Sequence, residues 1–247
     1  AVDCLLDRLV NFPSGMDTEG ASQYLDAISV LSEGNEAALN PHLIVLVHFL
    51  ESKQPGTVAS TAALLSQVLP HVPIGSVRAL SGLVDLLTKT IVGGTETAVQ
   101  AAIDCLFVYC SVSGGGFGLI VKLWEKFSRF LKDQLTSESG NAGSQSRALF
   151  ALGCLCRHAG FGKSGDPTIV PSHVTAAVSI FLRYFRIAEA NALVRTHALQ
   201  ALTMATRATP LVALDDKVGS LLRQVLSDAS APRHAAIAIG CLTDIVK

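Results

Sequence analysis

The chain has 247 residues, of which 49% are hydrophobic, 16% charged and only 6% aromatic. With so few aromatic residues, burial has to depend on Ala, Leu and Val, a mixture that favours closely packed helices. The formal net charge of -1 gives the whole chain no basic field of the kind that is typical of dedicated nucleic-acid-binding domains. Any contact with DNA is therefore expected to be local or to come from elsewhere.

No segment of the chain predicts a membrane span or a signal peptide. The longest apolar run, Leu43–Leu50, is too short to cross a bilayer and contains His48. We therefore expect a soluble protein. The first residue is not Met, and both Val2–Val10 and Ile237–Lys247 have helical spacing, so the chain is expected to be a segment of a longer protein.

A short phrase recurs along the chain: Ala, a large aliphatic residue, a spacer and another small or apolar residue. It occurs at Ala63, Ala102, Ala148, Ala198 and Ala236, with intervals of 39, 46, 50 and 38 residues. These intervals fit HEAT or armadillo repeats with insertions. In such repeats the small residue in the first helix lets the second helix of the repeat approach closely, while the aliphatic residues enter a core shared with neighbouring repeats.

The phrase predicts an all-α fold, an α-solenoid of HEAT-like antiparallel helix pairs with about five to six repeats, as one segment over 1–247. Between the helices that carry the phrase, amphipathic spacing predicts a second set: Pro41–Leu50, Ile74–Thr90, Gly118–Leu135, Ser172–Arg186 and Asp215–Leu226. Pro or a capping side chain marks the start of most of them, as at Asn40-Pro41 and Pro73. No segment alternates with period two for long enough to predict a strand.

Two connections are longer than the others. Residues 136–146 are small, polar and Gly-bearing, which predicts a flexible polar surface loop. Residues 160–171 are expected to form a second inter-helix loop. We expect both connections to lengthen the repeat without forming a domain boundary.

The six cysteines lie mostly inside apolar helical runs, where a free thiol behaves as a small hydrophobic residue. We expect them to be reduced and intracellular. Cys154, Cys156 and His158 resemble a metal-ligand cluster, but their spacing does not put them on one helix face and no second ligand pair follows. Packing in the core is therefore favoured over a metal site.

No catalytic motif is recognisable in the sequence. The Gly114–Gly116 run lacks the Gly-Lys-Ser/Thr of a phosphate loop, no serine occupies a Gly-x-Ser-x-Gly elbow, and no His-Glu-x-x-His pair occurs. The adjacent acids Asp215 and Asp216 are explained by the dipole of the helix that they are expected to start. We therefore expect a protein that is not an enzyme and that has no cofactor and no metal.

Basic side chains offer the best candidates for a binding surface. The predicted helix 118–135 carries Lys122, Lys126, Arg129 and Lys132, and its aromatic residues Trp124, Phe127 and Phe130 are expected to face the core. A solvated amphipathic face is favoured there over a phosphate-contacting one. Three further cations lie near the ends of their helices, where the dipole favours positive charge: Arg157, Arg183 and Arg186.

The run Arg147–His158, Arg-Ala-Leu-Phe-Ala-Leu-Gly-Cys-Leu-Cys-Arg-His, resembles the Leu-Phe-x-x-Gly-x-Leu-Cys-Arg-His phrase of the Nipped-B family, the cohesin loaders. Upstream, 98–109 and 117–130 look like the two preceding helices of that family. Downstream, the segments that look like its next repeats are 174–186, 194–206, 218–228 and 235–246. The resemblance extends over Pro41–Lys247 and is weaker toward the start.

The resemblance implies a segment of a large hook-shaped HEAT protein of the nucleus that loads cohesin onto DNA and stimulates the cohesin ATPase. Its partners would be the cohesin ATPase subunits, the kleisin subunit and DNA, with DNA bound weakly by this segment and no membrane contact. A small companion subunit would bind the distant amino-terminal part, outside this segment. The chain departs from the family in the short, neutral insertion at 136–146.

Two other functions remain open from the sequence. A generic HEAT adaptor, such as a nuclear-transport receptor or a phosphatase scaffold, would bind peptides along a concave face. An enzyme with an unrecognised site would need a deep pocket with convergent titratable groups.

Overall fold

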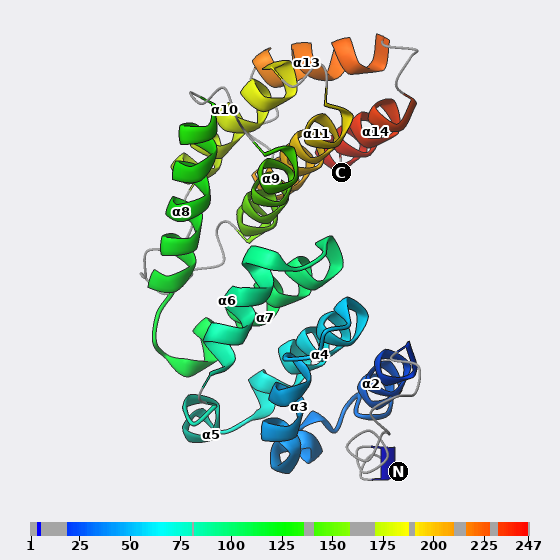
Figure 1. Ribbon diagram of the computed structural model, residues 1–247, viewed down its shortest axis with the longest axis vertical. Helices are drawn as coiled ribbons and strands as arrows, with labels where there is room; N and C mark the ends of the chain where they lie inside the picture. The colour runs from blue at the N-terminus through cyan, green and yellow to red at the C-terminus, as the bar shows by residue number, and fades with distance from the viewer. Residues whose placement is uncertain are drawn as a thin grey trace. The chain divides into compact units, whose positions relative to one another are not determined.

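The computed structural model describes residues 4–5, 19–80, 82–135, 141–158, 171–187, 191–209, 216–227 and 232–246. Among these residues the regular secondary structure is helical throughout (Figure 1). The chain divides into two compact units, Ala1–Gly116 and Phe117–Lys247. None of the described helices is both long enough and apolar enough to cross a membrane.

The first unit contains α2 (Glu19–Leu31), η1 (Glu36–His42), α3 (Leu43–Phe49), α4 (Pro55–Val68), η2 (Leu69–His71), α5 (Ile74–Arg78), α6 (Leu83–Gly93) and α7 (Glu96–Ser113). α4 packs against α2 on one side and α7 on the other, and α6 packs on α7. Fully buried aliphatic residues such as Leu25, Leu65 and Ile103 form the core between these helices. Burial of this aliphatic surface is what holds the helices together.

Two helices of the first unit differ from the prediction. The single helix expected over Ile74–Thr90 is two helices, α5 and α6, because Gly82 adopts a left-handed φ of 83° before α6 begins. The helix expected to start at Asn40-Pro41 instead begins as the 3-10 helix η1, which contains Pro41. Since Pro41 has no N–H, it cannot donate an α-helical hydrogen bond, and the α-helical part α3 starts only at Leu43.

The second unit contains α8 (Gly118–Gln134), α9 (Ala142–Arg157), α10 (Pro171–Ile187), α11 (Ala192–Ala208), α13 (Asp216–Ser227) and α14 (Pro232–Val246). α9, α11 and α14 pack on one another in that order, and we call them the first row. α8 packs on α9, α10 on α11 and α13 on α14, and these three helices are the second row. Each pair is one HEAT-like repeat.

The recurring phrase marks the closely packed helices, as predicted. In the second unit it falls on α9, α11 and α14, and in the first unit on α4 and α7. α9 and α11 approach each other closely, since a Cβ atom built on Gly153 would lie 2.6 Å from Cα of Ala201. Gly153 directly follows the phrase on α9 and Ala201 belongs to the phrase on α11, so small residues let two helices of the first row meet backbone to backbone. The sequence predicts this close approach between the two helices of a pair instead.

The loop predicted at 136–146 overlaps the start of α9, so the prediction is wrong for 142–146. Asn141 is the N-cap of α9, and its side chain accepts a hydrogen bond from the amide of Ser144. Residues 142–146 therefore belong to the helix, and Ser146 is 2% exposed. Residues 136–140 and 160–170 lie outside the described residues, whereas Pro171, expected to end the second loop, already belongs to α10. The prediction of one array over 1–247 stays a prediction.

Candidate nucleic-acid interface

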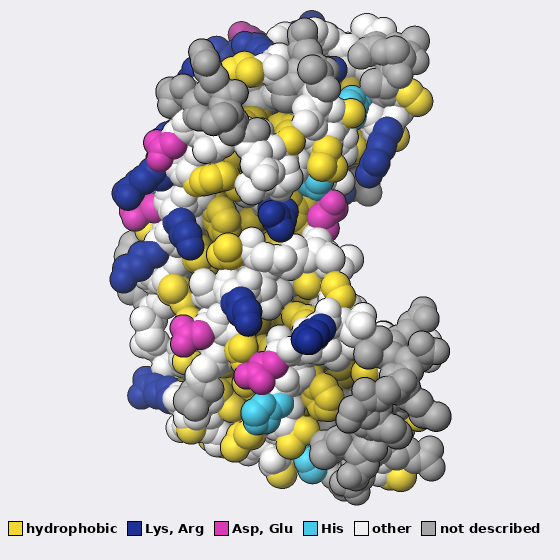
Figure 2. Space-filling model, in the orientation of Figure 1, with side chains coloured by type: hydrophobic (Ala, Val, Ile, Leu, Met, Phe, Trp, Pro, Cys, Tyr) yellow, Lys and Arg dark blue, Asp and Glu magenta, His cyan; other side chains and the backbone are white. Residues whose placement is uncertain are grey.

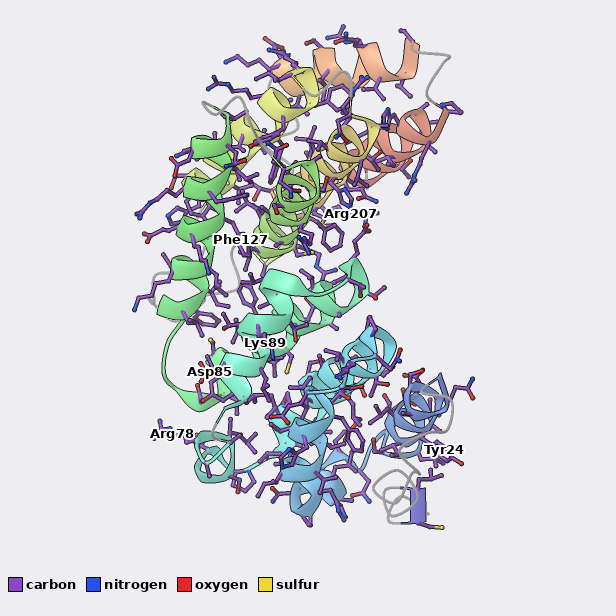
Figure 3. The ribbon with its side chains drawn as sticks, viewed as in Figure 1. Tyr24, Arg78, Asp85, Lys89, Phe127 and Arg207 are labelled. Atoms are coloured by element: carbon purple, nitrogen blue, oxygen red, sulfur yellow. The ribbon has the colours of Figure 1, made fainter. Side chains whose placement is uncertain are left out.

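α8 exposes the four basic side chains that the sequence singles out. Lys122, Lys126, Arg129 and Lys132 are all exposed, and Lys and Arg side chains gather along this helix in Figure 2. On the opposite face, Trp124 and Phe127 are each 7% exposed, and Phe127 lies between α8 and α9 in Figure 3. The aromatic residues thus anchor α8 in the unit and leave its cations facing water.

α10 lies beside α8 and brings further cations to the second row. The hydroxyl of Tyr184 donates a buried hydrogen bond of 2.9 Å to the carbonyl oxygen of Leu131. Closer to the start of both helices, the rings of Trp124 and His173 have centroids 4.7 Å apart. Because both contacts run in the same order along the two helices, α8 and α10 are parallel. Their carboxyl-terminal turns, which carry Lys132 on α8 and the exposed Arg183 and Arg186 on α10, therefore end close together.

Burial widens the pH range over which Tyr184 can make this contact. Desolvation raises the pKa of Tyr184 from 10.0 to about 12, against a smaller lowering by the neighbouring Arg183. The phenol, protonated at neutral pH in either case, therefore keeps its donor proton for Leu131 to a higher pH. This hydrogen bond fixes the two helices that carry six of the seven candidate cations.

Arg157 is the seventh candidate, and the structure separates it from the other six. It is the last residue of α9, in the first row, and it is half-buried. The residue before it, Cys156, lies fully in the core, and burial raises the pKa of its thiol to about 12. Arg157 therefore belongs to the first row and does not extend the row of exposed cations.

Two basic residues of the same row are missing from the sequence prediction. Lys217 and Arg223 are exposed on α13. With them, the second row carries eight Lys and Arg residues against three acids, which are Glu125, Asp133 and Asp216. This excess of positive charge is not apparent when each helix is considered alone. α13, for example, contributes only one net positive charge. Because first-row and second-row helices alternate along the sequence, summing the charges of alternate helices could have revealed the excess.

The two units also differ strongly in charge. Residues 1–116 contain 4 Lys and Arg against 11 Asp and Glu, a net charge of -7, and residues 117–247 contain 15 against 9, a net charge of +6. The near-neutral total that argued against a basic field is therefore the sum of two opposite charges. A charge asymmetry of this kind between parts of a chain is typical of proteins with a polyanionic partner.

The cysteines do not contribute to this surface. Cys154 and Cys156 are fully buried, and Sγ of Cys154 lies 3.7 Å from Sδ of Met204 on α11, so the predicted core packing is confirmed. In the described part of the chain no three His, Cys, Asp or Glu side chains gather in a way that could hold a metal ion. The exposed cations of the second row can act by charge and hydrogen bonding to phosphate oxygens.

Comparison with known proteins gives a likeness of fold. No protein-family model matches the sequence, and no curated protein matches it. Among solved structures, the chain is similar to the C-terminal fragment of the cohesin loader SCC2 of Chaetomium thermophilum, with a TM-score of 0.76 and 13% sequence identity. The match covers 99% of this chain and 20% of the SCC2 chain. The described helices therefore have the HEAT-like architecture of that fragment.

Proposed function

We propose that this chain is a non-catalytic scaffold segment of a cohesin loader of the nucleus. The observation that carries the proposal is the backbone likeness to the SCC2 fragment along 99% of the chain. The run Arg147–His158, which resembles the Nipped-B phrase, forms most of α9 and its C-cap, and α9 packs closely on α11 in the first row. Since the chain spans a fifth of the SCC2 chain, the activity proposed is that of a part acting within a longer protein.

The proposed mechanism is differential binding. The segment contacts the cohesin ATPase subunits and the kleisin, favours the ATP-engaged, DNA-clamped state of cohesin over the open state, and thereby promotes loading onto chromatin and ATP turnover. DNA is held weakly by the second row of the second unit, whose exposed cations neutralise phosphates without reading bases. A small companion subunit would bind elsewhere in the longer protein.

DNA binding is tested by reversing charge on α8. In the variant K122E/K126E/R129E we expect weaker binding of a short duplex, and the slope of log affinity against log salt to flatten by roughly 0.9 for each phosphate that the variant no longer neutralises. All three side chains are exposed, so the fold should be unaffected and circular dichroism should be unchanged. Unchanged affinity across the salt series would remove α8 from the proposed DNA surface.

The effect on cohesin is tested separately, by ATP turnover of purified cohesin with and without DNA in the presence of this chain. Stimulation that requires DNA is expected, and the α8 variant should stimulate less. If the chain binds cohesin in a pull-down but never changes turnover, it is a docking segment and the stimulating activity lies in other parts of the loader. Binding to neither cohesin nor DNA would contradict the proposal as a whole.

A further inference from the structure

A cavity in the second unit lies apart from the cations of α8. It has a volume of about 300 Å³, and four helices meet at it. Its described lining consists of Phe185 from α10, Arg195 from α11, Gln224, Val225 and Ser227 from α13, and His234 from α14. A water molecule occupies about 30 Å³ of the liquid, so the cavity is large enough for an amino-acid side chain.

Arg195 is held in this cavity with a donor unused. Its guanidinium carbon lies 4.5 Å from the centroid of the Phe185 ring, a cation–π contact that fixes the plane of the group. Nε of Arg195 is buried and has no hydrogen-bond partner in the part of the chain that the structure describes. Buried hydrogen-bond donors normally find an acceptor. The free-energy cost of leaving a buried donor without an acceptor is largest when the donor is charged. The arrangement therefore presents a prepared cationic donor to a ligand.

His234, which also lines the cavity, is held in place as well. The ring of His234, 7% exposed, packs edge-on against Phe185 with centroids 6.1 Å apart. The hydroxyl of Thr196 donates to the carbonyl oxygen of Ala192 at 2.7 Å, so its 3.0 Å contact with Nε2 of His234 has to be donated by the imidazole. This hydrogen bond joins α11 to α14 and holds the cavity open against rearrangement of the ring.

The lining determines which ligand fits. Among the described lining residues there is one cation and no acid, and the exposed side chains of Gln224 and Ser227 add neutral donors at the rim. A single guanidinium matches one negative charge, and its planar fork suits a carboxylate. A phosphate dianion would need a second cation. The apolar faces of Phe185 and Val225 suit the methylene groups of an acidic side chain.

We propose that this cavity, the Arg195 socket, binds the carboxylate of a glutamate or aspartate side chain from a partner protein. The net charge of +6 on residues 117–247 favours the approach of an acidic segment. Duplex DNA is a poorer occupant, because its phosphates lie along a convex backbone and reach exposed side chains more readily than a recessed one. The inference concerns a surface distinct from α8 and does not depend on the cohesin assignment.

The test uses the whole chain with a labelled Val225 methyl group as an NMR reporter. The probe is N-acetyl-glutamate N-methylamide, and its glutamine counterpart, inorganic phosphate and a short DNA duplex are the comparison ligands. We expect the chemical shift of the Val225 methyl group to change saturably with the concentration of the glutamate probe. The glutamine probe should bind at least tenfold more weakly. Arg195→Gln should abolish the shift, whereas Arg233→Gln, the same charge change at an exposed position of α14, should leave it.

A second variant keeps the test decisive if Arg195→Gln is poorly folded. Gln224 is exposed on α13, so Gln224→Ala should preserve the fold and weaken the glutamate probe several-fold. Equal binding of the glutamate and glutamine probes, or no saturable shift at all, would overturn the proposal. If phosphate binds as tightly as the glutamate probe, or if duplex DNA displaces it, the occupant is a phosphate and the carboxylate assignment is wrong.

Discussion

Four of the five cysteines whose side chains the structure describes lie in the core: Cys105 and Cys110 on α7, and Cys154 and Cys156 on α9. Burial raises the pKa of Cys110 to about 11 and that of Cys156 to about 12, and it raises the pKa of Cys105 further. Since the thiolate is the reactive form, these side chains behave as small hydrophobic groups at neutral pH. Cys4, by contrast, is exposed.

Thiol labelling tests whether each of the four buried cysteines is protected from reaction. In a variant with Cys4 and Cys241 replaced by serine, we expect none of the four buried thiols to react with an aromatic disulfide reagent at neutral pH, and all of them to react in concentrated guanidinium chloride. Fast reaction of any of them in the folded protein would show that its helix opens easily.

The same pKa shifts predict how stability depends on pH. The folded-state pKa values lie above the ordinary thiol value of 9.0, so above that pH the unfolded chain loses protons that the folded chain keeps. The stability contributed by protonated thiols is therefore complete below pH 9 and is lost as pH rises toward 11 and 12. Thermal unfolding should show a melting temperature that falls through this range. A flat alkaline profile would contradict the burial of these groups.

At the level of the elements, the distance between first-row helices depends on single small residues. A Cβ atom on Gly153 would lie 2.6 Å from Cα and 2.8 Å from Cβ of Ala201. Both are atoms of a helix that cannot move without disturbing its other contacts. Helix propensity alone favours Ala over Gly, so the close packing against Ala201 accounts for Gly at this position.

Gly153→Ala is therefore expected to destabilise the chain although it replaces the poorer helix former. Overpacking costs about 1–3 kcal/mol, which exceeds the propensity gain of about 1 kcal/mol. Gly219→Ala on α13 is the matched control, because its nearest contact is the end of Arg223 at 4.0 Å, and it should stabilise by about 0.5–1 kcal/mol. Urea unfolding of both variants measures the difference. A stabilising Gly153→Ala would show that α9 and α11 are less closely packed.

Helix starts give a second element-scale prediction. The side chain of Asn191 accepts a hydrogen bond of 3.2 Å from the amide of Val194 and caps α11, whereas Thr95, at the same position of α7, makes no such bond. Asn191→Ala should cost about 1 kcal/mol, and Thr95→Ala less than about 0.5 kcal/mol. Equal losses in thermal unfolding would mean that the cap contributes nothing specific.

At the scale of the whole molecule, opposite charges are distributed over the two units, -7 on residues 1–116 and +6 on residues 117–247. A polyanion responds to the local potential within about 10 Å at moderate salt, and not to the total charge. Despite its net charge of -1, the chain should therefore behave toward a polyanion as a basic protein.

Retention on heparin measures this difference. We expect the chain to bind at low salt and the variant K126E/R129E to elute at clearly lower salt. The double variant K53E/K89E, which changes the total charge equally at exposed positions of the first unit, should elute like the unchanged chain. Equal effects of the two variants would show that total charge, and not the second row, governs binding.

The helical repeat could be predicted from the sequence alone. The phrase that recurs from Ala63 to Ala236 falls on the closely packed helices, and three of the five predicted second helices, those that became α8, α10 and α13, match the structure closely. This succeeds because a solenoid buries its surface between chain neighbours, so local periodicity carries most of the fold. Two of the three aromatic residues predicted to face the core from α8, Trp124 and Phe127, are buried, whereas Phe130 is half-buried.

Features that depend on several helices at once emerge only in the folded chain. The second row joins cations from α8, α10 and α13, and the Arg195 socket takes its lining from four helices. The break at Gly82 and the helical start of α9 at 142–146 are likewise set by backbone conformation and a cap. Periodicity says which side of a helix is buried, but not which helices lie next to one another, and binding surfaces form only where neighbouring helices meet.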